Sequence, residues 1–228
     1  MSLLDGVRAV LLDIEGTTTP IAFVHDVLFS YARAHVREFL NENSAAADIA
    51  LLREEHAVDV EEGRNPPLPM DEYVEWLIAL DRKSTGLKSL QGKIWRQGYK
   101  AGSLQSQVFA DVAPAFQRWR ERGLRISIFS SGSVLAQQLL FAHTEVGDLT
   151  PFIDSYFDTR VGKKGDPESY RRIAEAMDLK PEQILFVSDV VTELEAANEA
   201  EMKTIMSIRP GNAQQPHYPS IRSFDDIR

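Results

Sequence analysis

The stretch VRAVLLDIEGTTTP, residues 7–20, decides how the rest of this 228-residue sequence is interpreted. Its first half is almost wholly apolar and predicts a buried strand over residues 7–14, which Gly16 and Pro20 then end. Residues i and i+2 of a strand point the same way, so the carboxylates of Asp13 and Glu15 are expected to lie in one pocket. Open α/β sheets hold their reactive groups at the carboxyl ends of their strands. Two carboxylates placed there suit a metal ion and a phosphate.

Short apolar runs recur further along the chain, over residues 124–130, 184–188 and 204–208. Helical patterns lie between them. This alternation of strands and helices predicts a parallel sheet covered on both faces. We therefore expect an α/β protein with a doubly wound, Rossmann-like parallel sheet.

More than a hundred residues separate the first two expected strands, which is far too many for a simple crossover connection. Apolar residues in this stretch recur at helical spacing, so it predicts an inserted helical domain. We place the core domain in residues 1–20 and 108–228 and the helical cap domain in residues 21–107. Helices of the insertion are expected over residues 24–41, 45–62, 71–82 and 87–99.

Composition limits the classes of function. Lys and Arg total 25 against 34 Asp and Glu, and a net charge of −9 repels nucleic acid and anionic lipid. The absence of cysteine excludes a thiolate nucleophile and Cys-ligated zinc, and it favours a reducing compartment. No apolar run has the length of a membrane span, and the first residues lack the pattern of a signal peptide. We expect a cytoplasmic monomer that acts on a small phosphorylated molecule, with no nucleic-acid or membrane partner.

A second chemical motif, SSGS, follows the strand expected at residues 124–130 and precedes a helical pattern at residues 134–143. Hydroxyls and backbone amides at a strand-to-helix turn form an anion site, which the helix dipole strengthens. We predict that Ser130 and Ser131 contact a phosphate. Serine is also a favoured helix cap, and that is the interpretation we prefer for Ser133.

A third motif is the lysine pair Lys163 and Lys164, in a loop before the helical pattern of residues 168–178. A lysine in this position can neutralise both a nucleophilic carboxylate and the oxygens of a phosphoryl group, because it acts as a mobile point charge. The alternative is an ordinary solvated loop. The order of the motifs along the chain favours a role in the site for one of the two lysines.

A fourth motif begins where the apolar run of residues 184–187 ends, at Ser188 and Asp189. Asp189 is predicted to bind Mg²⁺ beside Asp13, since this hard cation prefers oxygen ligands and keeps several waters. Glu193 follows one helical turn later. It either orients a metal-bound water or a neighbouring side chain, or it is an ordinary acid in the first turn of a helix.

Together the four motifs resemble those of the haloacid dehalogenase-like phosphatases, although each motif alone is common. Glu15 stands where that superfamily usually has Asp, and this departure is typical of its enolase-phosphatase (acireductone synthase) branch in methionine salvage. The resemblance covers nearly the whole chain, including LQGKIWRQGYKAG at residues 90–102, FADVAPAFQRWRERG at residues 109–123 and SDVVTELEAA at residues 188–197.

This resemblance implies a phosphatase that binds one Mg²⁺ per subunit through Asp13, Glu15 and Asp189. Asp13 would be the nucleophile that forms an aspartyl-phosphate. Glu15 would ligate the metal through its backbone carbonyl and transfer protons through its side chain. Lys164 aligns best with the family's motif lysine, with Lys163 as the fallback.

The resemblance also implies the substrate, 2,3-diketo-5-methylthiopentyl-1-phosphate, which is enolised and then dephosphorylated to an acireductone. Trp95 lies in the family-like part of the insertion and is a candidate contact for this substrate, although helix packing also explains an aromatic residue there. Two other functions remain open. One is a cap-bearing phosphatase that acts on phosphoglycolate or a sugar phosphate, and the other is a receiver-like module that signals through a phosphorylated Asp. Receiver-like modules lack an insertion of this size.

Overall fold

The structure is a computed structural model that describes residues 3–80, 82, 84–212 and 218–228. The chain divides into two compact units. The core unit comprises Met1–Phe23 and Gln105–Arg228, and the helical unit comprises Val24–Leu104. Their boundaries follow residues 23 and 104, whereas the sequence placed them after residues 20 and 107.

The core unit is built on a sheet whose strands, in the described part of the chain, are all parallel and follow the order β3-β2-β1-β4-β5-β6. The central strand β1 lies between β2 and β4, as the doubly wound arrangement requires. The expected fold class is therefore confirmed. The strands are β1 (Ala9–Leu12), β2 (Arg125–Phe129), β3 (Ser155–Phe157), β4 (Ile184–Ser188), β5 (Lys203–Ser207) and β6 (Ser220–Ile221).

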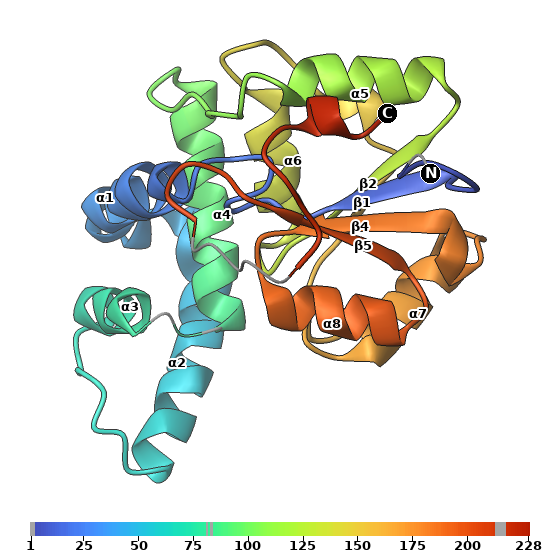
Figure 1. Ribbon diagram of the computed structural model, residues 1–228. Coiled ribbons are helices and arrows are strands. Elements are labelled where there is room, and N and C mark those ends of the chain that lie inside the picture. Colours follow the sequence, from blue (N-terminus) through green and yellow to red (C-terminus); the bar gives the residue numbers. More distant parts are fainter. Residues whose placement is uncertain (1–2, 81, 83, 213–217) are drawn as a thin grey trace. The chain divides into compact units, whose positions relative to one another are not determined.

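Helices cover both faces of this sheet (Figure 1): α5 and α6 lie above it in the picture, and α7 and α8 lie below. Residues on one face of β1, such as Ala9 and Leu11, belong to a core cluster with Tyr170 of α7 and Leu194 of α8. Coverage on both faces explains why every residue of β1 is buried and why its sequence is continuously apolar. The helices are α5 (Val112–Glu121), α6 (Val134–Ala142), α7 (Pro167–Ala176) and α8 (Val191–Glu199).

Two strands were not expected from the sequence. The strand β3 has three residues and β6 has two, and each lies at an edge of the sheet. Runs this short carry no readable alternation, so only their pairing with β2 and β5 defines them. Short 3-10 turns are found at Asn43–Ala45, Thr150–Phe152, Pro181–Gln183 and Phe224–Asp226.

The helical unit contains the four helical segments that its periodicity predicts, but the first one begins as a π-helix, η1 (Phe23–Phe29). Gly86 allows two of its helices to approach closely, because a Cβ at this position would lie 2.9 Å from Leu52. No helix in the described ranges has the length and hydropathy needed to cross a membrane. The α-helices are α1 (Ser30–Leu40), α2 (Ala46–Glu61), α3 (Met70–Ala79) and α4 (Thr85–Lys100).

A buried carboxylate on α2 joins this helix to α3 and to the segments that follow the two helices. The Asp59 side chain is 2 % exposed and accepts hydrogen bonds from Arg64 at 2.6 Å, Arg82 at 2.8 Å and the hydroxyl of Tyr73 at 2.9 Å. Burial tends to raise the pKa of Asp59, but these hydrogen bonds and charges outweigh it and hold the pKa below its usual 3.8. The carboxylate therefore stays ionised in the native protein at neutral pH.

We expect Asp59→Asn to lower the free energy of local opening of α2 and α3 by about 2 kcal/mol at neutral pH. This expected loss of free energy is smaller than for a fully buried ion pair, because Arg64 and Arg82 are 40 % and 35 % exposed. Because the pKa of Asp59 is lowered in the native protein, its ionised carboxylate stabilises the unit above pH 3.8, and this stabilisation is lost as the pH falls through the native pKa. The difference in opening free energy between Asp59→Asn and wild type should therefore shrink in that acidic range. Hydrogen exchange of the amides of α2 and α3 measures the free energy of local opening. Asp71→Asn, which breaks an exposed pair with Arg37, is the control and should cost less than about 0.5 kcal/mol.

Candidate active site

Three of the predicted residues lie where parallel strands end. Asp13 follows β1, is 5 % exposed, and donates its backbone N–H to Val187 of β4 at 3.0 Å. Ser130 follows β2 and donates its N–H to Phe157 of β3 at 3.1 Å. Asp189 follows β4. Since these strands run in the same direction, all three residues lie at the carboxyl edge of the sheet.

The segment after β1 is a tight, hydrogen-bonded turn. The carbonyl of Ile14 accepts from the amides of residues 17–19 at 2.9 to 3.2 Å, and the amide of Gly16 donates to the carbonyl of Thr19 at 2.8 Å. Gly16 has φ +67°, a backbone conformation that residues with a Cβ rarely adopt. The turn thus fixes the backbone on both sides of Glu15, which is half-buried.

Gly16 also packs directly against Asp189. A Cβ at Gly16 would lie 2.4 Å from Oδ2 of Asp189, which is far inside van der Waals contact. The first and fourth motifs, which are far apart in the sequence, therefore share one site.

Gly16→Ala is expected to reduce kcat by roughly 100-fold, because the new methyl group must displace either Asp189 or the turn beside Asp13. Gly123→Ala is the matched control: Gly123 has φ +76°, but a Cβ at this position would meet nothing within 4 Å, so that variant carries the backbone strain without the clash. The phosphate release that the four motifs imply, and the thermal melting, would be measured for both variants. Equal kcat values would show that the contact with Asp189 is unimportant.

Lys164 lies at the centre of a cluster of charged side chains. Its Nζ lies 2.5 Å from Oδ1 of Asp13 and 2.6 Å from Oε2 of Glu193, and its side chain is 9 % exposed. The hydroxyl of Tyr170 donates to the Lys164 carbonyl at 2.7 Å, and the ammonium lies 5.8 Å from the centre of the Phe129 ring. These contacts hold both the backbone and the charge of the lysine in place.

Glu193 accepts a second hydrogen bond, from Oγ of Ser188 at 2.9 Å. Of the roles considered for it, the geometry supports orientation of a neighbouring side chain, namely Lys164. Lys163, the other member of the lysine pair, is exposed.

The pKa values of these groups follow from burial and charge. Burial tends to lower the pKa of Lys164, but the negative charges of Asp13 and Glu193 outweigh it and raise that pKa above its usual value. Burial, and then the charge of Asp13, raises the pKa of Asp189 to about 7. The same two causes raise the pKa of Glu193, against the opposing effect of Lys164. Three carboxylates thus share one ammonium, and the site has an excess of negative charge.

This excess fits a divalent cation. Asp13 and Asp189 offer hard carboxylate oxygens beside the backbone of Glu15, which is the donor set that Mg²⁺ prefers. In the described part of the chain, no group of three or more His, Cys, Asp or Glu side chains is arranged to hold a metal by itself. Mg²⁺ does not need such a group, since one or two carboxylates and several waters often complete its shell.

The serine motif forms the turn before α6. Ser133 is the helix cap, as expected, because its Oγ accepts from the amide of Ala136 at 3.3 Å. Ser130 is 6 % exposed, and its Oγ accepts from the amide of Gly132 at 3.1 Å, while Ser131 is half-buried. Contact of Ser130 and Ser131 with a phosphate stays a prediction.

Trp95 belongs to the helical unit, on α4. Its indole N–H donates to the carbonyl of Leu28 at 2.8 Å, its ring stacks on Phe29, and it is 7 % exposed. The indole N–H is therefore already used in a hydrogen bond within the helical unit. A role of Trp95 in substrate binding stays a prediction, and it would involve contact with the face or edge of the ring.

The sequence did not predict the residues that support the turn at residues 16–19 from the end of β5 and the segment after it. The carbonyl of Gly16 accepts from Ser207 and Asn212, and the carbonyl of Thr17 accepts from Arg209. The signal in the sequence was their position: Ser207 ends β5, and Arg209 and Asn212 follow it in the turn-forming sequence SIRPGN at residues 207–212.

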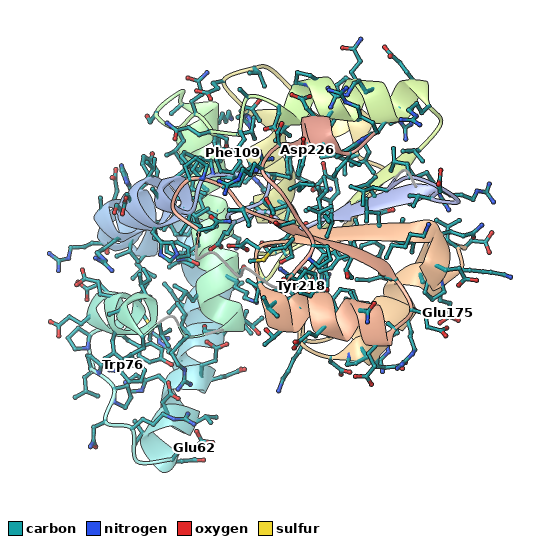
Figure 2. All side chains as sticks on the ribbon, in the orientation of Figure 1. Glu62, Trp76, Phe109, Glu175, Tyr218 and Asp226 are labelled. Atoms are coloured by element: carbon teal, nitrogen blue, oxygen red, sulfur yellow. The ribbon has the colours of Figure 1, made fainter. Side chains whose placement is uncertain are left out.

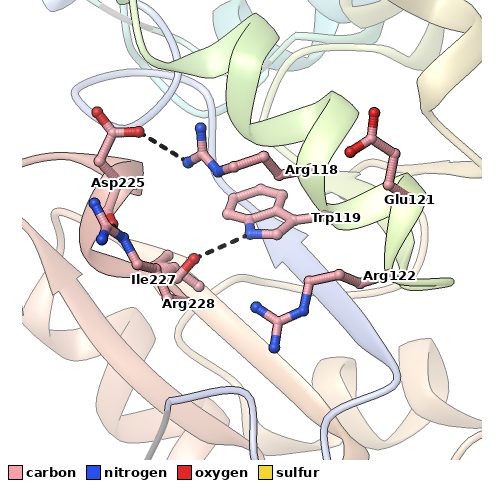
Figure 3. A pocket seen from close by; sticks show the side chains of 7 residues that line it. All are labelled: Arg118, Trp119, Glu121, Arg122, Asp225, Ile227 and Arg228. Atoms are coloured by element: carbon pink, nitrogen blue, oxygen red, sulfur yellow. Dashed lines mark hydrogen bonds and ion pairs between the residues drawn. The ribbon is translucent and has the colours of Figure 1, made fainter.

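A separate hollow of about 390 Å³ lies beside the carboxyl end of α5 (Figure 3). Its lining includes Arg118, Trp119 and Arg122, and it contains none of the predicted site residues. Arg122 shortly precedes β2, so the hollow is at the amino edge of the sheet, opposite the charged cluster.

Comparison with known proteins identifies the family of this chain. The family model of the haloacid dehalogenase-like hydrolases matches residues 7–201. Enolase-phosphatase E1 of Synechococcus elongatus is 51 % identical over 238 aligned residues that cover 100 % of both chains. Enolase-phosphatase E1 of Sorangium cellulosum is 47 % identical over 226 residues, covering 96 % of this chain and 97 % of the relative. Among solved structures, the UTR4 protein of Saccharomyces cerevisiae has a TM-score of 0.79 at 34 % identity, with 96 % of this chain and 99 % of that chain covered.

Fold, site and family model together define a hydrolase of the haloacid dehalogenase-like class. Both relatives, at 51 and 47 % identity over nearly the whole of each chain, are named enolase-phosphatase E1. The chain belongs to the enolase-phosphatases, which confirms the resemblance of its motifs and makes it a phosphatase. Phosphatases of this family generally use Mg²⁺.

Proposed function

We propose that this enzyme enolises 2,3-diketo-5-methylthiopentyl-1-phosphate and then hydrolyses its phosphate to give the acireductone of methionine salvage. Full-length similarity to relatives named enolase-phosphatase supports the assignment, as does Glu15 in the first motif. The observation that carries the chemistry is the contact between buried Asp13 and Lys164 at the end of β1. This contact places a cation against the carboxylate that would attack phosphorus, where it can also offset the charge of a phosphoryl group.

The proposed transfer has two steps. A carboxylate oxygen of Asp13 attacks phosphorus, the bond between phosphorus and the alcohol oxygen breaks, and the leaving oxygen takes a proton from Glu15. Water then attacks the aspartyl-phosphate, Glu15 takes a proton from that water, and the Asp13 carboxylate is restored. Lys164 offsets the negative charge that is present throughout.

Binding of the phosphoryl group is assigned to Lys164, Ser130, Ser131 and the amides at the start of α6. Mg²⁺ would be held by Asp13, Asp189 and the carbonyl of Glu15, and when bound it neutralises phosphate charge and polarises the phosphorus–oxygen bonds.

Enolisation requires removal of a proton from a carbon next to a carbonyl. Glu15 is the first candidate for this base because it lies on the turn next to the nucleophile. The methylthio end of the substrate is assigned to the helical unit near residues 91–95, with the ring of Trp95 as the candidate contact.

Single-turnover kinetics with the diketone phosphate would test the function, with the enol followed by absorbance and phosphate followed separately. We expect both signals, with the enol preceding phosphate. Rapid release of phosphate from phosphoglycolate or a sugar phosphate, without turnover of the diketone, would support a different cap-bearing phosphatase. A stable phosphoprotein that does not turn over would support the receiver-like alternative.

Removal of Mg²⁺ with a chelator is expected to abolish phosphate release, and Asp189→Asn should weaken Mg²⁺ binding by about 100-fold, since a direct ligand is lost. Calorimetric titration with Mg²⁺ measures this without substrate. Glu175→Gln, which changes an exposed acid on α7 (Figure 2), is the control and should bind Mg²⁺ like wild type. Full activity after chelation would contradict the metal assignment.

We also propose that the enzyme acts as a cytoplasmic monomer. The absence of cysteine supports a reducing compartment. A molar mass of 25.6 kDa from light scattering, as expected of one chain, would support the monomer, and a larger mass would contradict it.

A further inference from the structure

The turn that follows the nucleophile is held from outside at three consecutive carbonyls. Each of these carbonyls accepts a hydrogen bond from a segment distant in the sequence. The donors are Ser207 Oγ and Asn212 Nδ2 to Gly16 at 3.3 and 2.7 Å, Arg209 Nε to Thr17 at 3.2 Å, and the amide of Phe109 to Thr18 at 3.0 Å.

Arg209 is the most constrained of these donors. It is 5 % exposed, and its guanidinium carbon lies 4.5 Å from the ring centre of Phe109 and 4.6 Å from that of Phe224. Its Nη1 donates to Asp111 at 2.8 Å. A planar guanidinium packed against two rings and bonded to a carboxylate has little freedom to move, so its Nε presents a fixed donor to Thr17.

The same group ties the C-terminal segment to the turn. Oδ2 of Asp111, the acceptor for Arg209, also accepts from the hydroxyl of Ser223 at 3.0 Å and the amide of Phe224 at 2.5 Å. Arg209 in addition donates to the carbonyl of Arg222 at 3.2 Å. Phe109, labelled in Figure 2, begins the segment that leads through Asp111 into α5. One arginine therefore connects the start of α5, the C-terminal segment and the catalytic turn.

We propose that Arg209 is a positioning residue, which holds the turn at residues 16–19 through the Thr17 carbonyl and thereby sets the positions of Asp13 and Glu15. It does not contact the reacting atoms. A carbonyl that loses a buried charged donor must find another partner, and the turn must shift to offer one. Displacement of reacting groups by about 1 Å can cost 100-fold in rate, so a loosened turn should lower kcat. The rate argument rests on the proposed function, whereas the ordering of the turn does not.

Arg209→Lys tests the role because it keeps the charge but loses the planar fork and the ring contacts. Arg118→Lys is the matched control: Arg118 also holds the C-terminal segment, through the carbonyl of Phe224 at 3.2 Å and Asp225 at 2.9 Å (Figure 3), but it does not touch the turn. We expect exchange of the amides of residues 16–19 to be at least about tenfold faster in Arg209→Lys only. We expect kcat to fall at least about tenfold in that variant with KM nearly unchanged, and neither value to change in Arg118→Lys.

Unchanged protection of residues 16–19 in Arg209→Lys, or equal effects of both arginine variants, would overturn the proposal. Should Arg209→Lys not fold, Asn212→Ala removes the donor to the neighbouring Gly16 carbonyl and must show the same faster exchange for the proposal to stand. If the wild-type enzyme does not turn over the diketone phosphate, the proposed function fails, yet the exchange comparison still decides whether Arg209 orders the turn.

Discussion

Asp13→Asn is expected to abolish phosphate release, with kcat lowered by at least about 10⁴-fold, as is typical when a covalent nucleophile is removed. Asparagine keeps the size of the side chain, but its amide is a poor nucleophile towards phosphorus. The fold should survive, because Lys164 retains its ion pair with Glu193 at 2.6 Å. Acid quenching of a single turnover measures the phosphoenzyme directly, and none should form.

Asp13→Glu separates charge from position. It retains a carboxylate but places it one methylene further from β1, so it should also be nearly inactive if geometry matters as much as charge. Appreciable turnover by Asp13→Asn, with contamination by wild-type enzyme excluded, would contradict the covalent mechanism. A thermal melt of both variants would show whether loss of activity reflects loss of the fold.

Lys164→Met is expected to lower phosphate release by roughly 10³-fold, the upper range for removal of one group that stabilises charge in a transition state. The ammonium is the cation that faces both Asp13 and Glu193, and without it these carboxylates repel each other and the anionic substrate. Phosphate release should suffer more than enol formation, because the role we propose for Lys164 is to offset the charge of the phosphoryl group. The two signals of a single-turnover experiment measure this difference.

Lys163→Met is the control for this change, since Lys163 is the adjacent residue and is exposed. It should behave like wild type. Similar losses in the two methionine variants would show that the general charge of the loop matters, and not the contact with Asp13. Lys164→Arg should not restore activity, because the larger guanidinium must fit the space that the ammonium occupies 5.8 Å from the ring centre of Phe129.

The sequence by itself determined the parts of this protein that local patterns encode. The strands β1, β2 and β4 are mainly apolar runs, since both faces of a parallel sheet are buried, and the run at residues 204–208 indicated β5. A shared strand direction was then enough to predict that Asp13, Ser130 and Asp189 lie at one edge of the sheet. The helical insertion followed from its periodicity and from the length of chain between the first two strands.

Only the tertiary structure decided the remaining features, because they depend on contacts between residues far apart in the chain. The edge strands β3 and β6 exist through pairing with their neighbours and are too short to carry a pattern. The family resemblance already favoured Lys164 over Lys163, but the contact of Lys164 with a carboxylate 151 residues away is seen only in the structure. The hydrogen bond from Arg209 to Thr17, in the turn at residues 16–19, spans 192 residues. Burial and propensity act over a few neighbouring residues and leave a trace in local sequence, whereas the meeting of two distant polar groups is set by the packing of the whole core, which no local pattern records.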